Sequence, residues 1–239
     1  MSYPKDLNGR YFTRGPIILG GCPRSGTSLL LSILSACPNV YCIPEEAWAF
    51  YNTKHLDEFQ HYLQKWLWPK IPLGTEHWYP RWCEKTPRNV LAFQNIIEYF
   101  GPDARLIDVI RDGRDVVTSR HPQSPQKYWV EDWMWVWYVK EGLRFAEHPQ
   151  VLTIRYEHLV TDFETTIATV CEFINEKCTD SMLDWFNNTK IKTHSAWFGP
   201  VKPITKQSIG RGRDSNNDAV AKLMNNGEAV ALLTMLGYI

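Results

Sequence analysis

The chain has no excess of charge, because 26 Lys and Arg residues balance 26 Asp and Glu residues among its 239 residues. A neutral chain lacks the global positive field that attracts nucleic acid, so we expect no nucleic-acid partner. No apolar run approaches the roughly 20 residues of a membrane span. Residues 1–6 are polar with no apolar segment behind them, so no secretory signal is indicated and we expect a cytoplasmic protein.

Metal-binding and disulfide patterns are also missing. The six cysteines include no C-x-x-C pair, and no histidine spacing beside them is typical of zinc. We therefore expect no metal site. Reduced thiols in a cytosolic protein are the simplest interpretation, although the even number of cysteines leaves disulfides open. Hydrophobic residues, by contrast, are plentiful at 44%, enough to support a sizeable core.

The stretch 16–36 has the strongest local pattern. Its apolar start, 16–19, predicts a buried strand, residues 20–26 a glycine-rich turn, and residues 27–36 a leucine-rich helix. Strand, turn and helix in this order can hold a phosphate, because backbone N–H groups line the turn and the helix N-terminus carries partial positive charge. A plain structural turn would not need so many polar donors.

The same turn departs from the Walker A pattern, G-x-x-x-x-G-K-[ST]. Gly21 and Gly26 match the two glycines and Ser28 matches the hydroxyl position. Thr27 stands where the lysine of nucleotide triphosphatases reaches the β- and γ-phosphates, and Arg24 supplies a different positive charge. The pattern therefore favours one phosphate with an attached group. A P-loop kinase-like nucleotide enzyme is the alternative.

Two more buried strands are predicted, over 105–110 and 151–154, with helical segments between and after them. This alternation is typical of βαβ units. We predict an α/β, P-loop-type three-layer fold with a central, mostly parallel sheet flanked by helices. Residues 1–15 are predicted to form an N-terminal arm and residues 16–239 a single domain. Ligands bind at the carboxyl ends of such strands, and an arginine follows each of the three.

Three other regions carry structural predictions. Aromatic spacing predicts helices over 48–68 and 128–146. Residues 82–87 are predicted to form a turn that leads into a helix over 88–100. The indoles at helical spacing in the second aromatic region are interpreted mainly as core: Trp129, Trp133 and Trp137.

Residues 106–119 are a second candidate for phosphate binding. A strand delivers Arg111 at its exit, and Ser119 is predicted about two turns into the helix that follows. A guanidinium and a hydroxyl together can clamp a phosphate. On spacing alone, an exposed ion-paired turn at 111–114 would also explain the pattern.

Residues 23–30, Pro-Arg-Ser-Gly-Thr-Ser-Leu-Leu, resemble the 5′-phosphosulfate loop of sulfotransferases that use 3′-phosphoadenosine 5′-phosphosulfate (PAPS). The variant is closest to the tyrosylprotein sulfotransferases and their bacterial relatives. Residues 111–119 resemble the 3′-phosphate site of the same family. The resemblance implies PAPS as donor and 3′,5′-adenosine bisphosphate (PAP) as product. The nucleotide-binding residues it implies are Arg24, Ser25, Gly26, Thr27, Ser28, Arg111, Ser119, Tyr156 and Arg211.

The resemblance also implies a catalytic set. Glu45 would remove the proton of an acceptor hydroxyl, while Lys85 and Arg24 would stabilise the leaving group without a metal. Glu46 is an alternative base, because the Glu-Glu pair of the tyrosylprotein sulfotransferases is offset by one residue here, and Glu84 is a third candidate. On sequence alone, a helix-capping role explains the two adjacent glutamates equally well.

The acceptor is left open among a peptide tyrosine, a carbohydrate and a small molecule. Gly212 stands where tyrosylprotein sulfotransferases have Trp, which puts a tyrosine acceptor in question. Those enzymes are anchored in the Golgi, so a Golgi lumen location is expected only for a chain that has lost its anchor. A homodimer is left open. A catalytically inactive nucleotide-binding module is a further alternative, against which the joint presence of Glu45 and Lys85 argues.

Overall fold

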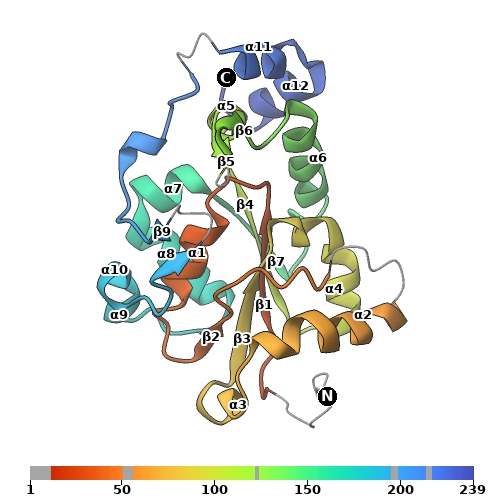
Figure 1. The fold of residues 1–239 in the computed structure, drawn as a ribbon, viewed down its shortest axis with the longest axis vertical. Coiled ribbons are helices and arrows are strands. Elements are labelled where there is room, and N and C mark those ends of the chain that lie inside the picture. Colours follow the sequence, from red (N-terminus) through yellow and green to blue (C-terminus); the bar gives the residue numbers. More distant parts are fainter. Residues whose placement is uncertain (1–11, 51–55, 122–123, 195–198, 214–216) are drawn as a thin grey trace.

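The computed structural model describes residues 12–50, 56–121, 124–194, 199–213 and 217–239. Its centre, within those residues, is a five-stranded sheet in the order β2-β3-β1-β4-β7, in which all neighbouring strands are parallel (Figure 1). The predicted parallel α/β fold is confirmed. The strands are β1 (Ile17–Gly21), β2 (Val40–Cys42), β3 (Arg81–Lys85), β4 (Arg105–Ile110) and β7 (Val151–Arg155).

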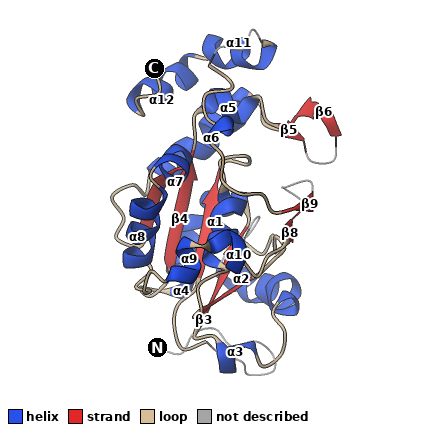
Figure 2. Ribbon diagram, turned by 90° about the vertical axis from the view of Figure 1, so that its left-hand side faces the viewer, coloured by secondary structure: helices blue, strands red, loops and turns tan. Residues whose placement is uncertain are grey.

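Side chains alternate along the strands, so each face of the sheet contributes to its own apolar core. Ile18 and Leu106 belong to one core, and Ile17 and Leu19 to the other. Figures 1 and 2 show helices on both sides of the sheet. The first core also takes residues from η3 (Pro87–Ala92), α4 (Phe93–Phe100), α6 (Asp132–Leu143), α11 (Asp218–Asn225) and α12 (Gly227–Met235). The second takes residues from α1 (Thr27–Leu34), α8 (Phe163–Phe173), α9 (Asp180–Leu183) and α10 (Trp185–Asn188).

Shorter elements complete the described chain. The helical ones are α2 (Leu56–Tyr62), the π-helical η1 (Leu63–Leu67), the 3₁₀ helix η2 (Trp68–Lys70), α3 (Thr75–Trp78), α5 (Gly113–Val117), α7 (Tyr156–Thr161) and η5 (Lys206–Ser208). Two small antiparallel ribbons pair β5 (Arg120–His121) with β6 (Ser124–Tyr128), and β8 (Thr193–His194) with β9 (Gly199–Pro200).

The prediction of a turn at 82–87 is wrong, because these residues form most of strand β3 and its exit. The strand carries charged residues that interrupt its apolar pattern, yet all of it is buried. Arg81 donates hydrogen bonds to the carbonyls of Gly15 (2.8 Å) and Ile174 (2.6 Å). Internal partners therefore replace the water that a charged strand would otherwise need. The helix predicted over 88–100 is divided into η3 and α4.

Of the three tryptophans predicted as core on residues 128–146, Trp129 does pack against the first core, whereas the other two are a correction. Helix α6 spans only Asp132–Leu143, and Trp133 and Trp137 are 55% and 42% exposed. The buried stripe is the neighbouring one, with Trp135 and Tyr138 almost fully enclosed. Two stripes of similar hydrophobicity thus compete along this helix, and spacing alone does not say which one faces inward.

Several other regions can be compared with the sequence predictions. The helix predicted over 48–68 begins at α2, after an irregular stretch and the undescribed residues 51–55. The arm predicted over 1–15 lies mostly outside the described residues, although Phe12 stacks on Trp68 with ring centroids 6.3 Å apart. All six cysteines are described, and all are free thiols. In the described ranges, no helix is long and apolar enough to cross a membrane.

Candidate functional site

A cavity of about 400 Å³ lies where β1, β3 and β4 end. The carboxyl edge of a parallel sheet is where such folds bind ligands, because the loops and helix N-termini converge there. One half of the lining comes from the loop after β1 and from the exits of β4 and β7: Arg24, Gly26, Thr27, Ser28, Arg111 and Tyr156. The other half, which we call the acceptor half, is lined by Glu46, Trp48, Lys85, Arg88, Trp129 and Tyr138.

The loop after β1 has the conformation of an anion-binding turn. Gly26, at φ 103°, is the N-cap of α1, and no side chain caps the helix. Its first backbone N–H groups are therefore available to an anion, reinforced by the helix dipole. A Cβ on Gly26 would lie 2.4 Å from the ring of Tyr156, so only glycine allows this close approach. The Ser25 hydroxyl is buried beside this turn and has no hydrogen-bond partner among the described residues.

Arg111, at the exit of β4, connects three parts of the first half. Its Nη1 donates to the Arg24 carbonyl at 3.0 Å, and its Nη2 donates to the Ser208 carbonyl. The guanidinium carbon lies 4.2 Å from the centre of the Tyr156 ring, and the Tyr156 hydroxyl is 2.6 Å from Ser208 Oγ. The buried Nε of Arg111 has no partner within the described ranges. This arrangement suits a guanidinium held ready for a phosphate.

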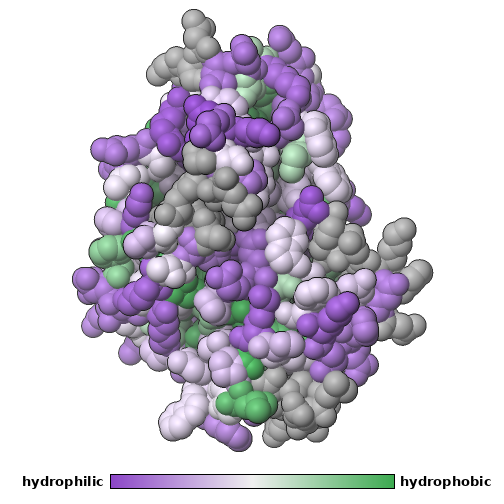
Figure 3. Space-filling model, in the orientation of Figure 1, coloured by the Kyte–Doolittle hydropathy of each residue, from purple (hydrophilic) through white to green (hydrophobic). Residues whose placement is uncertain are grey.

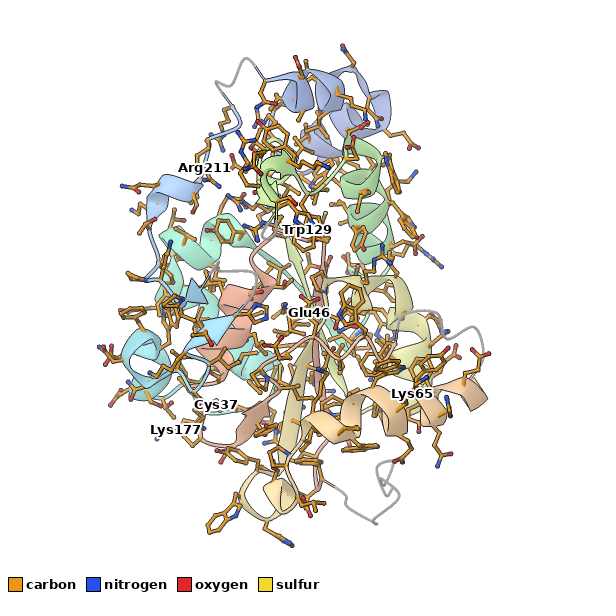
Figure 4. All side chains as sticks on the ribbon, viewed as in Figure 1. Cys37, Glu46, Lys65, Trp129, Lys177 and Arg211 are labelled. Carbon is orange, nitrogen blue, oxygen red and sulfur yellow. The ribbon has the colours of Figure 1, made fainter. Side chains whose placement is uncertain are left out.

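Three arginines concentrate positive charge at the first half. Burial, and then the charges of Arg111 and Arg211, lower the pKa of Arg24 to about 10. Mutual repulsion of this kind is relieved when an anion binds between the cations. Arg211 lies on the segment between η5 and α11, and Figure 4 shows it above and to the left of Trp129. The structure thus brings Arg24, Arg111 and Arg211 close enough to influence one another.

Asp115 anchors the segment that carries Arg211. Its two carboxylate oxygens accept hydrogen bonds from the backbone N–H groups of Gly210 and Gly212, each at 2.8 Å. A Cβ on Gly212 would lie 2.2 Å from the carbonyl oxygen of Arg114. Gly212 is therefore a packing requirement of this chain, and a tryptophan could not occupy the position without moving the loop. Sequence reasoning missed Asp115, although it lies within the motif that starts at Arg111.

Ser119 does not occupy the position predicted for it. Helix α5 ends at Val117, so Ser119 lies beyond the helix and not two turns into it. Its buried hydroxyl donates to the carbonyl of Asp115 at 2.8 Å, and it is not among the described residues that line the cavity. The short helix follows from the cap at Asp112, whose carboxylate accepts the Arg114 N–H, and from the return of the chain into β5.

Lys85 and Glu46 form an ion pair in the acceptor half, with Lys85 Nζ 2.6 Å from Glu46 Oε1. The lysine side chain is 1% exposed and the glutamate side chain 23%. Glu45, the base suggested from the sequence, is exposed and does not line the cavity. Figure 4 shows Glu46 near the middle of the molecule, below Trp129. The one-residue alternative, Glu46, is therefore the glutamate that meets Lys85.

Glu84, the third candidate base, does not line the cavity and holds the neighbouring backbone. It is fully buried, which raises its pKa, and it accepts hydrogen bonds from the Ala47 N–H (2.9 Å), Thr86 (2.6 Å) and Asn89 (2.6 Å). The Trp48 N–H in turn donates to Thr86 Oγ1 at 3.3 Å. These contacts fix the segment after Glu46 against the exit of β3.

One further residue near this ion pair was missed from the sequence. His194, on β8, is 3% exposed, and burial together with the charge of Lys85 lowers its pKa to about 4. The imidazole is therefore neutral near pH 7. No motif marks it, because β8 belongs to a segment that the sequence shows only as irregular and polar.

Figure 3 shows polar residues over most of this face, with several small hydrophobic patches, one of them at the lower edge beside α3. Within the described ranges, no group of three or more Asp, Glu, His or Cys side chains is arranged to hold a metal ion. Within the cavity, Trp48, Trp129 and Tyr138 contribute aromatic rings to the acceptor half.

Solved structures provide an independent comparison of the fold. The sulfotransferase domain from the curacin biosynthetic pathway has a TM-score of 0.69 at 15% identity, with 95% of this chain and 99% of that chain covered. The sulfotransferase domain of the Synechococcus PCC 7002 olefin synthase has a TM-score of 0.63 at 16% identity, with 99% of each chain covered. Mouse sulfotransferase SULT7A1, complexed with PAP, has a TM-score of 0.56 at 14% identity, with 94% and 88% covered.

No curated protein matches the chain by sequence. The model of the Sulfotransferase family matches residues 49–180, more than half of the chain. That range contains Lys85, Arg111 and Tyr156 but not the loop after β1. The resemblance of residues 23–30 to the phosphosulfate loop is therefore a separate observation that the family match does not include. The match does not test the tyrosylprotein branch, which stays a prediction. With a parallel sheet, an anion-binding turn and this match in agreement, the chain belongs to the sulfotransferase family.

Proposed function

We propose that the protein transfers a sulfuryl group from PAPS to a hydroxyl of an acceptor. The observation that carries the proposal is a single cavity that combines an uncapped helix N-terminus, Arg24 and Arg111 with the Glu46–Lys85 ion pair. The first half offers the donors that two phosphate groups need. The acceptor half offers a carboxylate that can accept a proton. PAP in the mouse structure supports this choice of nucleotide.

The residues of the first half would hold the nucleotide. The turn at Ser25–Ser28 fits the 5′-phosphate, because the uncapped N-terminus of α1 leaves backbone N–H groups available to an anion and the buried Ser25 hydroxyl has no hydrogen-bond partner among the described residues. Arg111 fits the 3′-phosphate, and Tyr156 and Arg211 complete the nucleotide contacts. Ser119 would act by positioning, since its hydroxyl supports Asp115 and hence the loop that carries Arg211.

The transfer itself needs one proton acceptor and charge stabilisation. The acceptor oxygen forms a bond to sulfur while the bond from sulfur to the phosphate oxygen breaks. The hydroxyl proton passes to the Glu46 carboxylate, and the negative charge that develops on the phosphate oxygen is stabilised by Lys85 and Arg24. Glu46 replaces Glu45 in this role because only Glu46 reaches Lys85 and the cavity.

Two adjacent variants test the assignment. Glu46→Gln should lower turnover by about 100-fold or more, the usual size of a lost general base, because the amide cannot take the proton. Glu45→Gln is the matched control and should retain turnover within about threefold, as expected for an exposed side chain. Both should bind PAP like the unmodified protein in calorimetry. If turnover falls strongly in Glu45→Gln but not in Glu46→Gln, then Glu45 is the base.

Nucleotide titrations test the donor. PAP should bind tightly with or without Mg²⁺, and ADP and ATP should bind more weakly because they lack the 3′-phosphate. Preference for ATP with Mg²⁺ would contradict the proposal and make the kinase-like alternative the better one.

A further inference from the structure

Helix α6 presents two tryptophans to solvent. Trp133 and Trp137 are both exposed, although an indole is among the largest apolar side chains. Their ring centroids lie 6.5 Å apart, and their planes are inclined to one another by 21°. The two rings are therefore nearly parallel and form one aromatic surface, which we call the indole pair. Contiguous exposed apolar surface of this kind tends to mark a place where a ligand or partner binds.

The indole pair is continuous with the acceptor half of the cavity. Met134 and Tyr138, on the same helix, line that half. Trp137 follows Met134 by three residues, a spacing that makes two side chains neighbours on the surface of a helix. The rings of Trp137 and Tyr138 meet edge to face, with their centroids 5.7 Å apart. A ligand that extends from the cavity along α6 therefore meets the indole pair next.

A third exposed indole lies at the edge of the acceptor half. Trp48 lines the cavity and is 46% exposed. Its φ is 57°, a left-handed value that bulky residues rarely adopt. Hydrogen bonds from the Ala47 N–H to Glu84 and from the Trp48 N–H to Thr86 hold this backbone. Strain that is enforced by its surroundings tends to occur at functional sites, so we assign Trp48 a contact with the ligand at the mouth of the cavity.

Polar side chains flank the indole pair along α6. Glu141 follows Trp137 by four residues and so lies beside it on the helix surface. Arg144, which is itself exposed, donates to Glu141 Oε2 at 2.6 Å. Flat apolar rings beside groups that bond hydroxyls suit a pyranose, whose C–H groups cover its faces and whose hydroxyls surround its edge. A lipid chain matches the rings but offers nothing to the ion pair.

Resting on the proposed function, we propose that the acceptor is a carbohydrate chain, with one sugar hydroxyl at Glu46 and Lys85 and a ring further along the chain packed on Trp133 and Trp137. The cavity holds the sugar that reacts, and Trp48 packs against the chain at the mouth. The indole pair then selects chains that are long enough to reach it. It contributes to binding of the acceptor and takes no part in the chemical step.

Chain length tests the proposal by calorimetry on the protein–PAP complex. The probes are cellobiose and cellotetraose, and diacetylchitobiose and tetraacetylchitotetraose, which are neutral chains of flat sugars. In at least one of the two series, the tetramer should bind about tenfold or more tightly than the dimer, because only the tetramer reaches the indole pair. Equal affinity of dimer and tetramer in both series would overturn the proposal, and so would failure of all four probes to bind the PAP complex.

Single variants separate the indole pair from the cavity and from the nucleotide site. Trp137→Ala should remove the advantage of the tetramer, while the affinities for the dimer and for PAP stay within about threefold. Trp78→Ala, at an exposed indole on α3, is the matched control and should keep the advantage. A tetramer advantage that survives in Trp137→Ala would show that the chain binds elsewhere, and the proposal would be wrong.

Two further outcomes are distinguishable from these. Analytical ultracentrifugation shows whether the protein self-associates. A dimer that Trp137→Ala dissociates would assign the indole pair to a second copy of the chain and would also overturn the proposal. Failure of the unmodified protein to bind PAP would instead count against the proposed function.

Discussion

The two halves of the cavity are built in different ways. The first half takes its residues from strand exits, where a few consecutive positions would form each proposed phosphate contact, as at 24–28 and 111–115. The acceptor half assembles single residues from three separated segments, around 46–48, 85–88 and 129–138. A phosphate needs a defined backbone conformation, and that requirement leaves a contiguous motif in the sequence. An acceptor pocket needs only a shape, which distant residues can supply together.

The largest expected effect would come from the first half. Arg111→Ala should lower PAP affinity by about 100-fold or more, because truncating a buried, hydrogen-bonded charge costs about 2–5 kcal/mol. It also removes the contacts of Arg111 with the Arg24 and Ser208 carbonyls. Calorimetry with PAP measures the loss, and Arg144→Ala, at an exposed ion pair on the surface, is the control. If Arg111→Ala changes PAP affinity by less than about threefold, Arg111 does not bind the nucleotide and the proposed division of the cavity into two halves is wrong.

A smaller effect, on catalysis and not on PAP binding, is expected when Glu84, which holds the backbone of the acceptor half, is replaced. Glu84→Gln places an amide N–H against the Asn89 amide and weakens the contacts that hold Ala47 and Thr86. We expect a fall in kcat/KM of about tenfold, corresponding to about 1.4 kcal/mol, with PAP affinity unchanged. Steady-state kinetics at saturating PAPS measures it, with Glu98→Gln on the surface as the control. A matching loss of PAP affinity would show that the halves are not independent.

The smallest effect on function is expected at Asp108, which supports neither half. Asp108 is buried in the sheet, and neither oxygen has a hydrogen-bond partner among the described residues. Burial raises its pKa from 3.8 to about 7. The folded state therefore holds a proton that the unfolded state has lost between these values, so stability falls as pH rises through this window, by about 1.4 kcal/mol per pH unit.

Asp108→Asn removes this pH dependence because asparagine does not ionise. The variant should gain stability relative to the unmodified protein as pH rises from 5 to 8, by about 1.4 kcal/mol for each pH unit up to the folded pKa. Urea unfolding at the two pH values measures the difference, and PAP affinity should stay the same. A constant difference at both pH values would show that Asp108 is ionised throughout.

The strands of the first half could be predicted from the sequence for a physical reason, while the roles of its residues stay predictions. An apolar run that ends in a polar turn, as at β1 and β4, indicates a buried strand and also offers donors that a phosphate would need. Strand β3 was missed because Arg81, Glu84 and Lys85 interrupt its apolar run. Their charged side chains can be buried only with hydrogen-bond partners, and those partners come into reach only when the chain folds. Gly15, which accepts from Arg81, lies 66 residues away in sequence, and Asn89 donates to Glu84 from the element that follows the strand. No local pattern records such partners.

A local pattern also could not show which of two adjacent glutamates, Glu45 or Glu46, reaches Lys85. Glu45 and Glu46 follow β2 in an irregular segment, where adjacent side chains point in different directions. Which of them reaches Lys85 depends on how Glu84 and Thr86 hold Ala47 and Trp48. The family resemblance indicates that the base is one of these two glutamates, but it does not show which one. Helix α6 shows an equivalent ambiguity between its two apolar stripes.

The Asp115 carboxylate connects a loop to an arginine that lines the cavity. It accepts the N–H groups of Gly210 and Gly212, and it lies 3.7 Å from Arg111 Nη2. The loop and the arginine thus share one anchor. Under the proposed function, in which Arg111 holds the nucleotide, a movement of this loop would also disturb the nucleotide contact, and release of PAP would be coupled to that movement.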